Sequence, residues 1–310
     1  MTRARIIGTG SYLPEKILTN DDLSRMVDTS DEWIYTRTGM RARHIAAEDE
    51  TTSDMALAAA RPAMEAAGIT AEALDLIILA TTTPDLHFPA TACKVQAELG
   101  AKCPAFDIQA VCSGFVYALE IADKMIKSGE YKRVLAIGAE KMSRLIDWTD
   151  RSTCVLFGDG AGAAVLEATE ARGGILATEI RADGDLYDVL KTNDAGKIHM
   201  DGQDVFKTAV QKVPEVSLAV LEKAEIPVEK LDWFIPHQAN IRIIDAAVKR
   251  LGVAEAKVIK TIESQANTSA ASVGISLDMA AREGKLKRGD KVLLTAMGAG
   301  FTWGAIALEY

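Results

Sequence analysis

Two stretches of this sequence, about 155 residues apart, repeat the same succession of helix, turn and strand signals. AGITAEALDLIILA at 67–80 and AEIPVEKLDWFIPH at 224–237 share an alanine, two isoleucines, a glutamate and a Leu-Asp pair. Any two helix–strand units share such signals, but here the order of matching pieces is kept over more than about 60 residues, which favours a duplication. We therefore expect two similar halves, residues 1–170 and 171–310, with a functional site where they meet.

Short apolar runs alternate with amphipathic stretches along the chain, a pattern typical of α/β proteins with mainly parallel, buried strands. Strands are expected at 4–9, 74–82, 104–109, 132–140, 154–167, 173–183, 231–237, 258–262, 291–297 and 302–310. Helices are expected at 55–68, 115–129 and 244–252. The polar segment 183–204 should link the halves or run over the surface. The segment 28–53 has little periodicity and should form an insertion over the surface of the first half.

The composition limits the classes of protein to which the chain can belong. With 310 residues, 48% of them hydrophobic, it can bury a large core without disulfides or a structural metal. Its four cysteines stand at irregular spacings with no CxxC pair, which predicts reduced thiols in the cytoplasm and no metal site. The strand expected at 4–9 leaves no leader segment, and no apolar run approaches the roughly 18 residues of a spanning helix. A net charge of −9 disfavours nucleic acid and anionic membranes as partners.

Cys112 stands where an apolar strand is expected to pass directly into a helix, in FDIQAVCSGFVYAL at 106–119. The free N–H groups and the positive dipole end of a helix favour an anion, so the pKa of this thiol should be lowered and part of it should be reactive thiolate. A small cysteine packed against the sheet explains the segment equally well. The other cysteines are more simply core or loop residues, and these are Cys93, Cys103 and Cys154.

Two polar side chains occupy comparable positions in the second half. His237 follows the apolar strand of IPHQANIRI at 235–243, at a strand end where α/β sheets place catalytic groups. Asn267 aligns with Cys112 under the duplication. Its alternative role is purely structural, as the N-cap of the helix that follows. A cysteine, a histidine and an asparagine on three turns are therefore candidates for one site.

Two glycine-rich segments bring further backbone N–H groups into consideration. The loop of Gly298, Ala299 and Gly300 is either an oxyanion-binding loop or an ordinary hairpin turn. GDGAGA at 158–163 lacks the spacing and the lysine of a phosphate-binding loop, so we expect a closely packed strand turn.

In combination these segments resemble the β-ketoacyl-acyl-carrier-protein synthase III family, over nearly the whole chain and in the family's order. The matching strings are DEWIYTRTGMRARHI (31–45), FDIQAVCSGF (106–115), DRSTCVLFGDGAGA (150–163), PHQANIRI (236–243), NTSAAS (267–272) and GAGFTWG (298–304). The resemblance implies the thiolase fold, an α/β fold with two similar halves in a five-layered αβαβα arrangement. One departure is the pair Gln265-Ala266, where many relatives carry His-Gly or a similar pair, so the preferred acyl-chain length is less certain than the reaction.

The resemblance also implies a mechanism. Cys112 would take the acyl group of an acyl-coenzyme A, acetyl by default, and hold it as a thioester. The N–H groups of Cys112 and of the loop at Ala299 and Gly300 would bind the oxyanion. Malonyl-acyl carrier protein would then lose carbon dioxide while His237 and Asn267 donate hydrogen bonds to the enolate, and the carbanion would attack the acyl group. No metal or redox cofactor is implied.

Binding residues follow from the same resemblance. The positions for coenzyme A map onto Trp33, Arg37, Thr38, Arg151, Leu156, Met200, Gly202, Phe206, Ala239 and Asn240. An indole and a guanidinium can enclose adenine, although Trp33 and Arg37 could equally be a plain surface pair. The positions for acyl carrier protein map onto Gln238, Ala239, Asn240, Ile241, Arg242, Lys249 and Arg250, with Lys207 and Lys212 expected nearby. Phe88 matches a residue that reaches the acyl pocket of a partner subunit, which implies a homodimer.

Several functions remain open at this point. The leading interpretation is an enzyme that initiates fatty-acid synthesis from acetyl-coenzyme A. A paralogue using longer, branched or aromatic primers in secondary metabolism is the alternative. A non-catalytic scaffold that binds carrier proteins is a third possibility, against which the intact set of Cys112, His237 and Asn267 speaks. Elongating synthases use two histidines and thiolases a second cysteine, so Asn267 separates the chain from both.

Overall fold

The computed structural model describes residues 2–310, in which most strands belong to two sheets. The strands are β1 (Arg3–Tyr12), β2 (Lys16–Thr19), β3 (Ala42–Ile45), β4 (Leu76–Ala80), β5 (Ala105–Ile108), β6 (Arg133–Glu140), β7 (Gly160–Thr169), β8 (Gly174–Ala182), β9 (Leu190–Thr192), β10 (Ile198–Met200), β11 (Trp233–Pro236), β12 (Lys291–Gly298) and β13 (Thr302–Glu309). The first sheet has the order β1-β7-β6-β4-β5 and the second β11-β12-β13-β8. The pairs β2–β3 and β9–β10 lie apart from both sheets.

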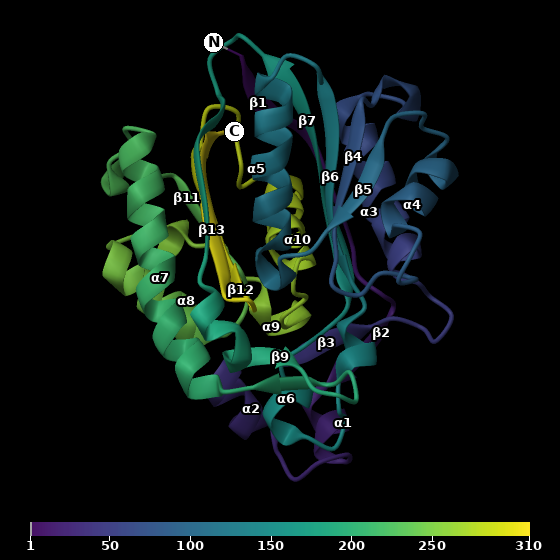
Figure 1. Ribbon diagram of the computed structural model, residues 1–310. Helices are drawn as coiled ribbons and strands as arrows, with labels where there is room; N and C mark the ends of the chain where they lie inside the picture. The colour runs from purple at the N-terminus through teal and green to yellow at the C-terminus, as the bar shows by residue number, and fades with distance from the viewer. Residues whose placement is uncertain (1) are drawn as a thin grey trace.

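Helices lie on both outer faces of the sheets and between them. They are α1 (Asn20–Ser24), α2 (Asp31–Thr38), α3 (Thr52–Ala67), α4 (Thr91–Leu99), α5 (Gly114–Lys127), α6 (Arg151–Cys154), α7 (Gly202–Lys223), α8 (Ile241–Leu251), α9 (Ile262–Gln265) and α10 (Ala271–Arg282). In Figure 1, α3 and α4 cover the first sheet, α5 and α10 fill the middle, and α7 and α8 cover the second sheet. The expected five-layered arrangement is confirmed.

The two sheets repeat one topology. In the first, β4 and β6 are parallel while β6–β7 and β7–β1 are antiparallel. In the second, β11 and β12 are parallel while β12–β13 and β13–β8 are antiparallel. The counterpart of β5 is a single parallel bridge between Phe234 and Val258. Cys112 and Asn267 precede the equivalent central helices α5 and α10. Residues 170 and 171 fall between β7 and β8, the strands on either side of the change of sheet, and we propose that the halves divide there.

The central strands are apolar on both faces because helices cover both faces. In β4, Leu76 and Ile78 point into the cluster between the sheets, and Ile77 and Leu79 point toward α3 and α4. This alternation follows from the two-residue period of a strand, and burial on both sides explains the continuous apolar run.

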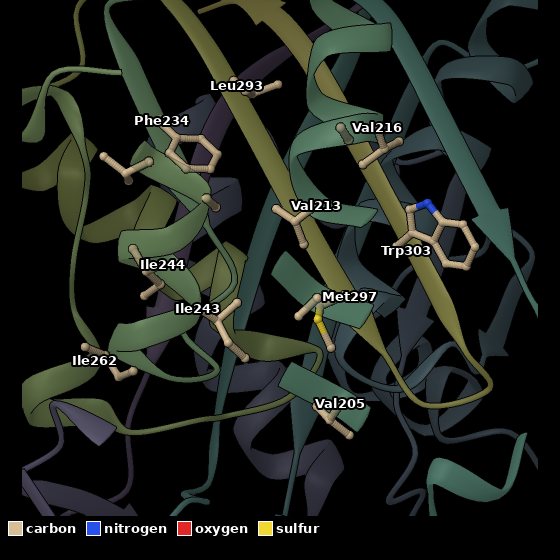
Figure 2. Close-up of a cluster of buried hydrophobic side chains, with 14 of the residues drawn as sticks. Val205, Val213, Val216, Phe234, Ile243, Ile244, Ile262, Leu293, Met297 and Trp303 are labelled. Carbon is tan, nitrogen blue, oxygen red and sulfur yellow. The ribbon is translucent and has the colours of Figure 1, made fainter. Parts of the chain in front are cut away.

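A third cluster lies between the second sheet and its outer helices, and it reaches the functional cavity. Figure 2 shows side chains of α7 and α8 packed against those of the strands. The helices contribute Val205, Val213, Val216, Ile243 and Ile244, and β12 and β13 contribute Leu293, Met297 and Trp303. Met297 also lines the cavity described below. The hydrophobic packing of this layer therefore fixes one wall of the site.

Small residues let α10 approach the first sheet closely. A Cβ added at Gly138 would lie 2.3 Å from the carbonyl oxygen of Ala270, and one at Gly162 would lie 2.5 Å from the carbonyl carbon of Gly274. Glycine is required at such points because any side chain would push the two backbones apart. The predicted close packing of the GDGAGA segment is thus confirmed, and the close approach places Asn267, at the start of this unit, beside Cys112.

Two of the expected strands differ from the structure. At 154–167, α6 ends at Cys154 and the strand begins only at Gly160, because the Asp150 side chain accepts a hydrogen bond from the Ser152 N–H and caps a short helix instead. At 258–262 only Val258 forms a bridge, because the Gln238 side chain accepts the N–H groups that follow it at positions 261 and 262. In both places, side-chain oxygens accept backbone N–H groups that would otherwise bond to a neighbouring strand.

The structure decides between the alternatives for one surface segment and corrects the placement of another. The segment 183–204 follows β8, which already belongs to the second sheet, so it is a surface excursion containing β9 and β10 and not the link between the halves. The segment 28–53 was expected to cover the first half. Instead, its α2 packs on α8 and its β3 on α9, because the apolar side chains of Ile34 and Met40 join the core cluster of the second half.

Candidate active site

A cavity of about 420 Å³ joins the two halves, and it contains all three residues expected to carry the chemistry. Cys112, His237 and Asn267 line it, and all three are buried, with exposed fractions of 5%, 5% and 6%. The lining also includes exposed side chains such as Phe206, at 40% exposure, so the cavity leads from the surface to the three buried groups. This shape suits a long substrate whose reactive end must be kept from water.

Cys112 lies in a 3-10 turn, Val111–Ser113, directly before α5. Val111 has the positive φ of 46°, a left-handed conformation that is strained for a β-branched residue and turns the chain sharply from β5 into the helix. A Cβ at Gly114 would lie 2.9 Å from the Cβ of Ala80, so glycine allows the helix to start against β4. The turn holds the sulfur at the cavity, as the strand-to-helix pattern predicted.

The expected lowering of the thiol pKa is wrong. Burial, as the largest cause, and the nearby Glu140 carboxyl raise the pKa of Cys112 to about 12, against smaller opposing effects of hydrogen bonds from Ser269 and Asn267. The free energy needed to remove a thiolate from water is larger than the stabilisation that the helix N-terminus provides. The resting residue is therefore a neutral thiol.

His237 follows β11 and is held by its backbone N–H, which donates to the Thr295 carbonyl at 2.8 Å. Burial lowers the pKa of its imidazole to about 3, so the ring is neutral at physiological pH. A neutral imidazole can donate one hydrogen bond without adding charge to the site. This is the protonation state that the proposed role in enolate stabilisation requires.

Asn267 is held by its own backbone and side chain. Its N–H donates to the Leu156 carbonyl at 2.9 Å, and its carbonyl accepts from the Gly158 N–H at 3.0 Å. Its Oδ1 accepts the Ser269 N–H at 2.8 Å. Because the side-chain oxygen is occupied, the Nδ2 amide group is the one available to the cavity, as a donor. Asn267 does not act as a simple helix cap, since α10 begins only at Ala271 and its N-cap residue is Ala270.

The glycine-rich loop connects β12 to β13 and touches the cysteine turn. A Cβ at Gly298 would lie 2.7 Å from the backbone nitrogen of Cys112, so only glycine fits there. Gly298 lines the cavity, whereas Ala299 and Gly300 lie in the turn that follows, where Gly300 has φ 128°. The hairpin and the oxyanion interpretations are thus compatible, since this turn is a hairpin placed against the Cys112 backbone.

The residues expected to bind coenzyme A surround the same cavity. All of them line it except Arg151, which lies beside it. The Arg37 and Arg151 guanidinium carbons are 4.5 Å and 4.7 Å from the centre of the Trp33 ring. At these distances no second aromatic ring fits between an arginine and the indole, so enclosing a base there requires one guanidinium to move.

The expected carrier-protein residues divide into two groups. Arg242 lines the cavity, and its guanidinium donates to the Thr36 carbonyl at 3.2 Å, while Lys249 and Arg250 lie exposed farther along α8. Ala239, Asn240 and Ile241 are partly buried at the start of the helix.

Gln238 does not belong with that surface. It is 1% exposed, its side-chain nitrogen donates to the Pro236 carbonyl at 2.7 Å, and its oxygen accepts backbone N–H groups. Its amide groups are used inside the fold, so the expectation that its side chain contacts a carrier protein is wrong.

Phe88 and the pair Gln265-Ala266 lie away from the cavity lining. Phe88 is 81% exposed, next to Leu86 at 61%, on the loop that follows β4. Gln265 and Ala266 are both buried, at 1% exposure each, so this departure from the family's strings does not alter the lining directly.

Two residues near the sulfur escaped the sequence analysis. Glu140, at the end of β6, is fully buried and accepts a hydrogen bond from the Ser269 hydroxyl at 3.0 Å. Burial, opposed by several hydrogen bonds, raises the pKa of Glu140 to about 7. The available signal was a glutamate directly after the apolar run VLAIGA at 134–139, where a charge is unexpected.

Among the described residues there is neither a cluster of metal-binding side chains nor a helix suited to span a membrane. In the range 2–310, no group of three or more histidine, cysteine or acidic side chains is placed to hold a metal ion. Over that same part of the chain, no helix combines the length and the apolar character needed to cross a membrane.

Known proteins match the chain over its full length. Models for "3-Oxoacyl-[acyl-carrier-protein (ACP)] synthase III" and for its C-terminal part match residues 106–184 and 221–310. A β-ketoacyl-[acyl-carrier-protein] synthase III of Xanthomonas campestris pv. campestris is 54% identical, covering 99% of this chain and 98% of that protein. The crystal structure of 3-oxoacyl-[acyl-carrier-protein] synthase III from Aquifex aeolicus is 56% identical with a TM-score of 0.98, covering 99% of this chain and 100% of that one. The priming β-ketosynthase of the R1128 polyketide pathway is 38% identical with a TM-score of 0.94, covering 98% and 96%.

Paired sheets around two central helices, with a cysteine, a histidine and an asparagine at the junction of two like halves, define an acyl-transferring condensing enzyme of the thiolase fold. Within that class, the chain belongs to the β-ketoacyl-acyl-carrier-protein synthase III family. The family and fold expected from the sequence strings are confirmed.

Proposed function

We propose that this enzyme condenses an acyl-coenzyme A, acetyl by default, with malonyl-acyl carrier protein to give a 3-oxoacyl-carrier protein, coenzyme A and carbon dioxide. The observation that carries the proposal is the cavity in which buried Cys112, His237 and Asn267 meet at the end of a passage open to the surface. The full-length similarity to synthases of this name supports the same reaction.

In the first half-reaction, the Cys112 sulfur attacks the thioester carbonyl of the acyl-coenzyme A and coenzyme A leaves. The backbone N–H groups of Cys112 and Ala299 bind the oxyanion that forms, an assignment supported by the close contact of Gly298 with the cysteine turn. Because the resting thiol is neutral, its proton must leave as the carbon–sulfur bond forms.

In the second half-reaction, malonyl-carrier protein loses carbon dioxide and its thioester carbonyl becomes an enolate. Neutral His237 and the Nδ2 group of Asn267 donate hydrogen bonds to that oxygen. The carbanion attacks the acyl carbonyl, and the Cys112 sulfur is released. Decarboxylation itself supplies the carbanion, so the site needs donors rather than a strong base, which is what its residues offer. We propose no metal or redox cofactor.

The substrates enter along the residues assigned from the family. Coenzyme A lies along the cavity wall from Trp33 and Arg37 to Asn240, after one arginine has moved from the indole. The acidic carrier protein docks at the mouth on the positive charges of Arg242, Lys249 and Arg250. This local basic face resolves the conflict between an acidic partner and a net charge of −9.

Charge reversal at Arg242 tests the docking face. Arg242→Glu should raise the KM for malonyl-carrier protein about tenfold, because a cavity-mouth charge then repels the carrier, while acylation by acetyl-coenzyme A changes little. Steady-state kinetics and the rate of acyl-enzyme formation measure the two effects separately. Arg172→Glu, at a side chain 89% exposed beside the β8 strand start, gives the same change in net charge and should leave both unchanged. An equal loss in both half-reactions of Arg242→Glu would contradict the assignment.

We further propose that the enzyme is a cytoplasmic homodimer. Exposed Phe88 and Leu86 form an apolar loop tip without contact to their own cavity, which suits insertion into a partner subunit. Four free cysteines suit a reducing compartment.

Primer choice is tested by intact mass measurement of the enzyme after mixing with a panel of acetyl-, branched-, long-chain and aromatic acyl-coenzyme A thioesters. We expect the acetyl adduct to form fastest, followed by a 3-oxoacyl product when malonyl-carrier protein is added. Fastest acylation by a branched or aromatic thioester would instead support the paralogue, for which the likeness to the polyketide priming enzyme is the observation. No adduct from any thioester would refute the enzymatic function.

A further inference from the structure

The turn that carries Asn267 is strained on both sides. Ala266 has the positive φ of 55° and Ser269 that of 50°, values that residues with a side chain rarely adopt. In the described part of the chain only four non-glycine residues have a positive φ, and Val111, which adjoins Cys112, is another of them. Such conformations are unfavourable and persist only where surrounding contacts hold them. The contacts that hold this turn are therefore candidates for a role in the reaction.

Ser269 connects the strain to the side-chain amide of Asn267. Its N–H donates to Asn267 Oδ1 at 2.8 Å, the bond that leaves Nδ2 as the group available to the cavity. The next residue, Ala270, is fixed against β6, where a Cβ at Gly138 would lie 2.3 Å from its carbonyl oxygen. Because α10 cannot follow, a change in the φ of Ser269 would rotate the peptide group that precedes it. The Thr268 carbonyl would then replace the N–H and draw Nδ2 away from the cavity.

A buried carboxyl group at the end of β6 anchors the Ser269 side chain. The Ser269 hydroxyl donates to Glu140 Oε1 at 3.0 Å, and Glu140 is 0% exposed. The carboxyl group is itself fixed by the loop after β4, because it accepts the Thr82 N–H at 3.1 Å and the Thr83 hydroxyl at 2.6 Å. A buried polar group with several hydrogen bonds has little freedom to move, so it holds the Ser269 hydroxyl in one place.

We propose that Glu140 is a positioning residue for the decarboxylation of malonyl-carrier protein. By holding the Ser269 hydroxyl, it keeps the strained turn in the conformation in which Nδ2 of Asn267 can donate to the enolate oxygen. The inference rests on the proposed function, in which Asn267 is one of the two donors. Glu140 does not line the cavity, so its carboxyl group acts only through Ser269.

The other bonds of Asn267 limit what the loss of this anchor would change. Its backbone N–H and carbonyl are held by Leu156 and Gly158, whether or not Ser269 is anchored. The residue would therefore stay at the cavity while its amide group turns over. Acylation of Cys112 uses backbone N–H groups as oxyanion donors and not this amide, so only the second half-reaction should slow.

Two substitutions of Ser269 separate the anchor from the strain. Ser269→Ala removes the hydroxyl and keeps a Cβ, so the positive φ loses its support, and kcat for release of carbon dioxide from malonyl-carrier protein should fall about tenfold at an unchanged KM. Ser269→Gly also removes the hydroxyl, but glycine adopts a positive φ freely, so kcat should stay within about threefold of the wild type. A side chain that only filled space would give the larger loss on the change to glycine.

Glu140→Gln tests the other end of the contact. One acceptor oxygen becomes a donor, so Thr82, Thr83 and Ser269 compete for the remaining oxygen, and carbon dioxide release should again fall about tenfold. Combined with Ser269→Gly, which needs no anchor, the same change should lower the rate by less than about threefold. The rates are compared at about pH 8, above the Glu140 pKa of about 7, so that the wild-type carboxyl group is ionised.

Ser143→Ala is the matched control, because it removes another serine–carboxylate bond, to buried Asp159 at 2.6 Å and outside the cavity lining, and it should keep the wild-type rate. Wild-type decarboxylation in Ser269→Ala, an equal loss in Ser269→Gly, or an equal slowing of acylation by acetyl-coenzyme A would overturn the proposal. A wild type that neither decarboxylates nor forms an acyl adduct would instead refute the proposed function itself. Should Ser269→Ala not fold, Glu140→Gln and the double variant decide, since the glycine must then restore the rate.

Discussion

Replacing Cys112 with alanine should lower kcat/KM for condensation by about 10⁴-fold or more, because no other group at the cavity can hold the acyl chain. The acyl adduct seen by intact mass should disappear completely. Decarboxylation of malonyl-carrier protein should persist, since His237 and Asn267 keep the positions from which they stabilise the enolate. The variant would therefore release carbon dioxide without forming a 3-oxoacyl product.

A matched control exists elsewhere in the chain. Cys154→Ala removes another fully buried thiol, at the end of α6 and outside the cavity lining, so it should retain acylation. An acyl adduct persisting on Cys112→Ala, or one lost equally in Cys154→Ala, would contradict the assignment of the nucleophile.

Changing Asn267 to aspartate should slow decarboxylation of malonyl-carrier protein by about 10²- to 10³-fold, the usual effect of removing one oxyanion donor. The substitution keeps the shape of the side chain, and one oxygen can still accept the Ser269 N–H. The second oxygen, however, replaces the Nδ2 donor and places an acceptor where the enolate oxygen develops.

Released carbon dioxide measures this step without acyl-coenzyme A, so a slower acylation of the same variant does not enter the result. The thermal unfolding midpoint of Asn267→Asp serves as a check that the backbone bonds of this residue to Leu156 and Gly158 persist. Decarboxylation at the wild-type rate in a folded Asn267→Asp would show that the amide is not the donor.

The pKa of Cys112 illustrates where reasoning from local sequence fails. The strand-to-helix pattern correctly placed the cysteine at a turn before α5, and a helix terminus does favour an anion. The strand-to-helix pattern gave no information on which distant parts of the chain pack over that turn. The fold buries Cys112 to 5% exposure, and this burial outweighs both the dipole and the hydrogen bonds of Asn267 and Ser269.

Gln238 and the segment 28–53 show the same limit for surfaces. Gln238 was assigned to a carrier-protein surface from the family resemblance, and 28–53 to the surface of the first half because it has little periodicity. The structure uses the Gln238 amide as a substitute for missing ladder bonds after β11, and it uses α2 to cover α8. Neither use can be read from composition, because each depends on a partner far away in the chain.

The sequence by itself determined the duplication, the alternation of buried strands and helices, the family, and the three residues Cys112, His237 and Asn267. These follow from periodicity and from local strings, which are properties of the sequence and do not depend on tertiary contacts. Only the tertiary structure decided that the three meet in one buried cavity and that burial keeps both the thiol and the imidazole neutral there. Protonation depends on burial and on neighbours from the other half, and the packing of the two halves alone creates both.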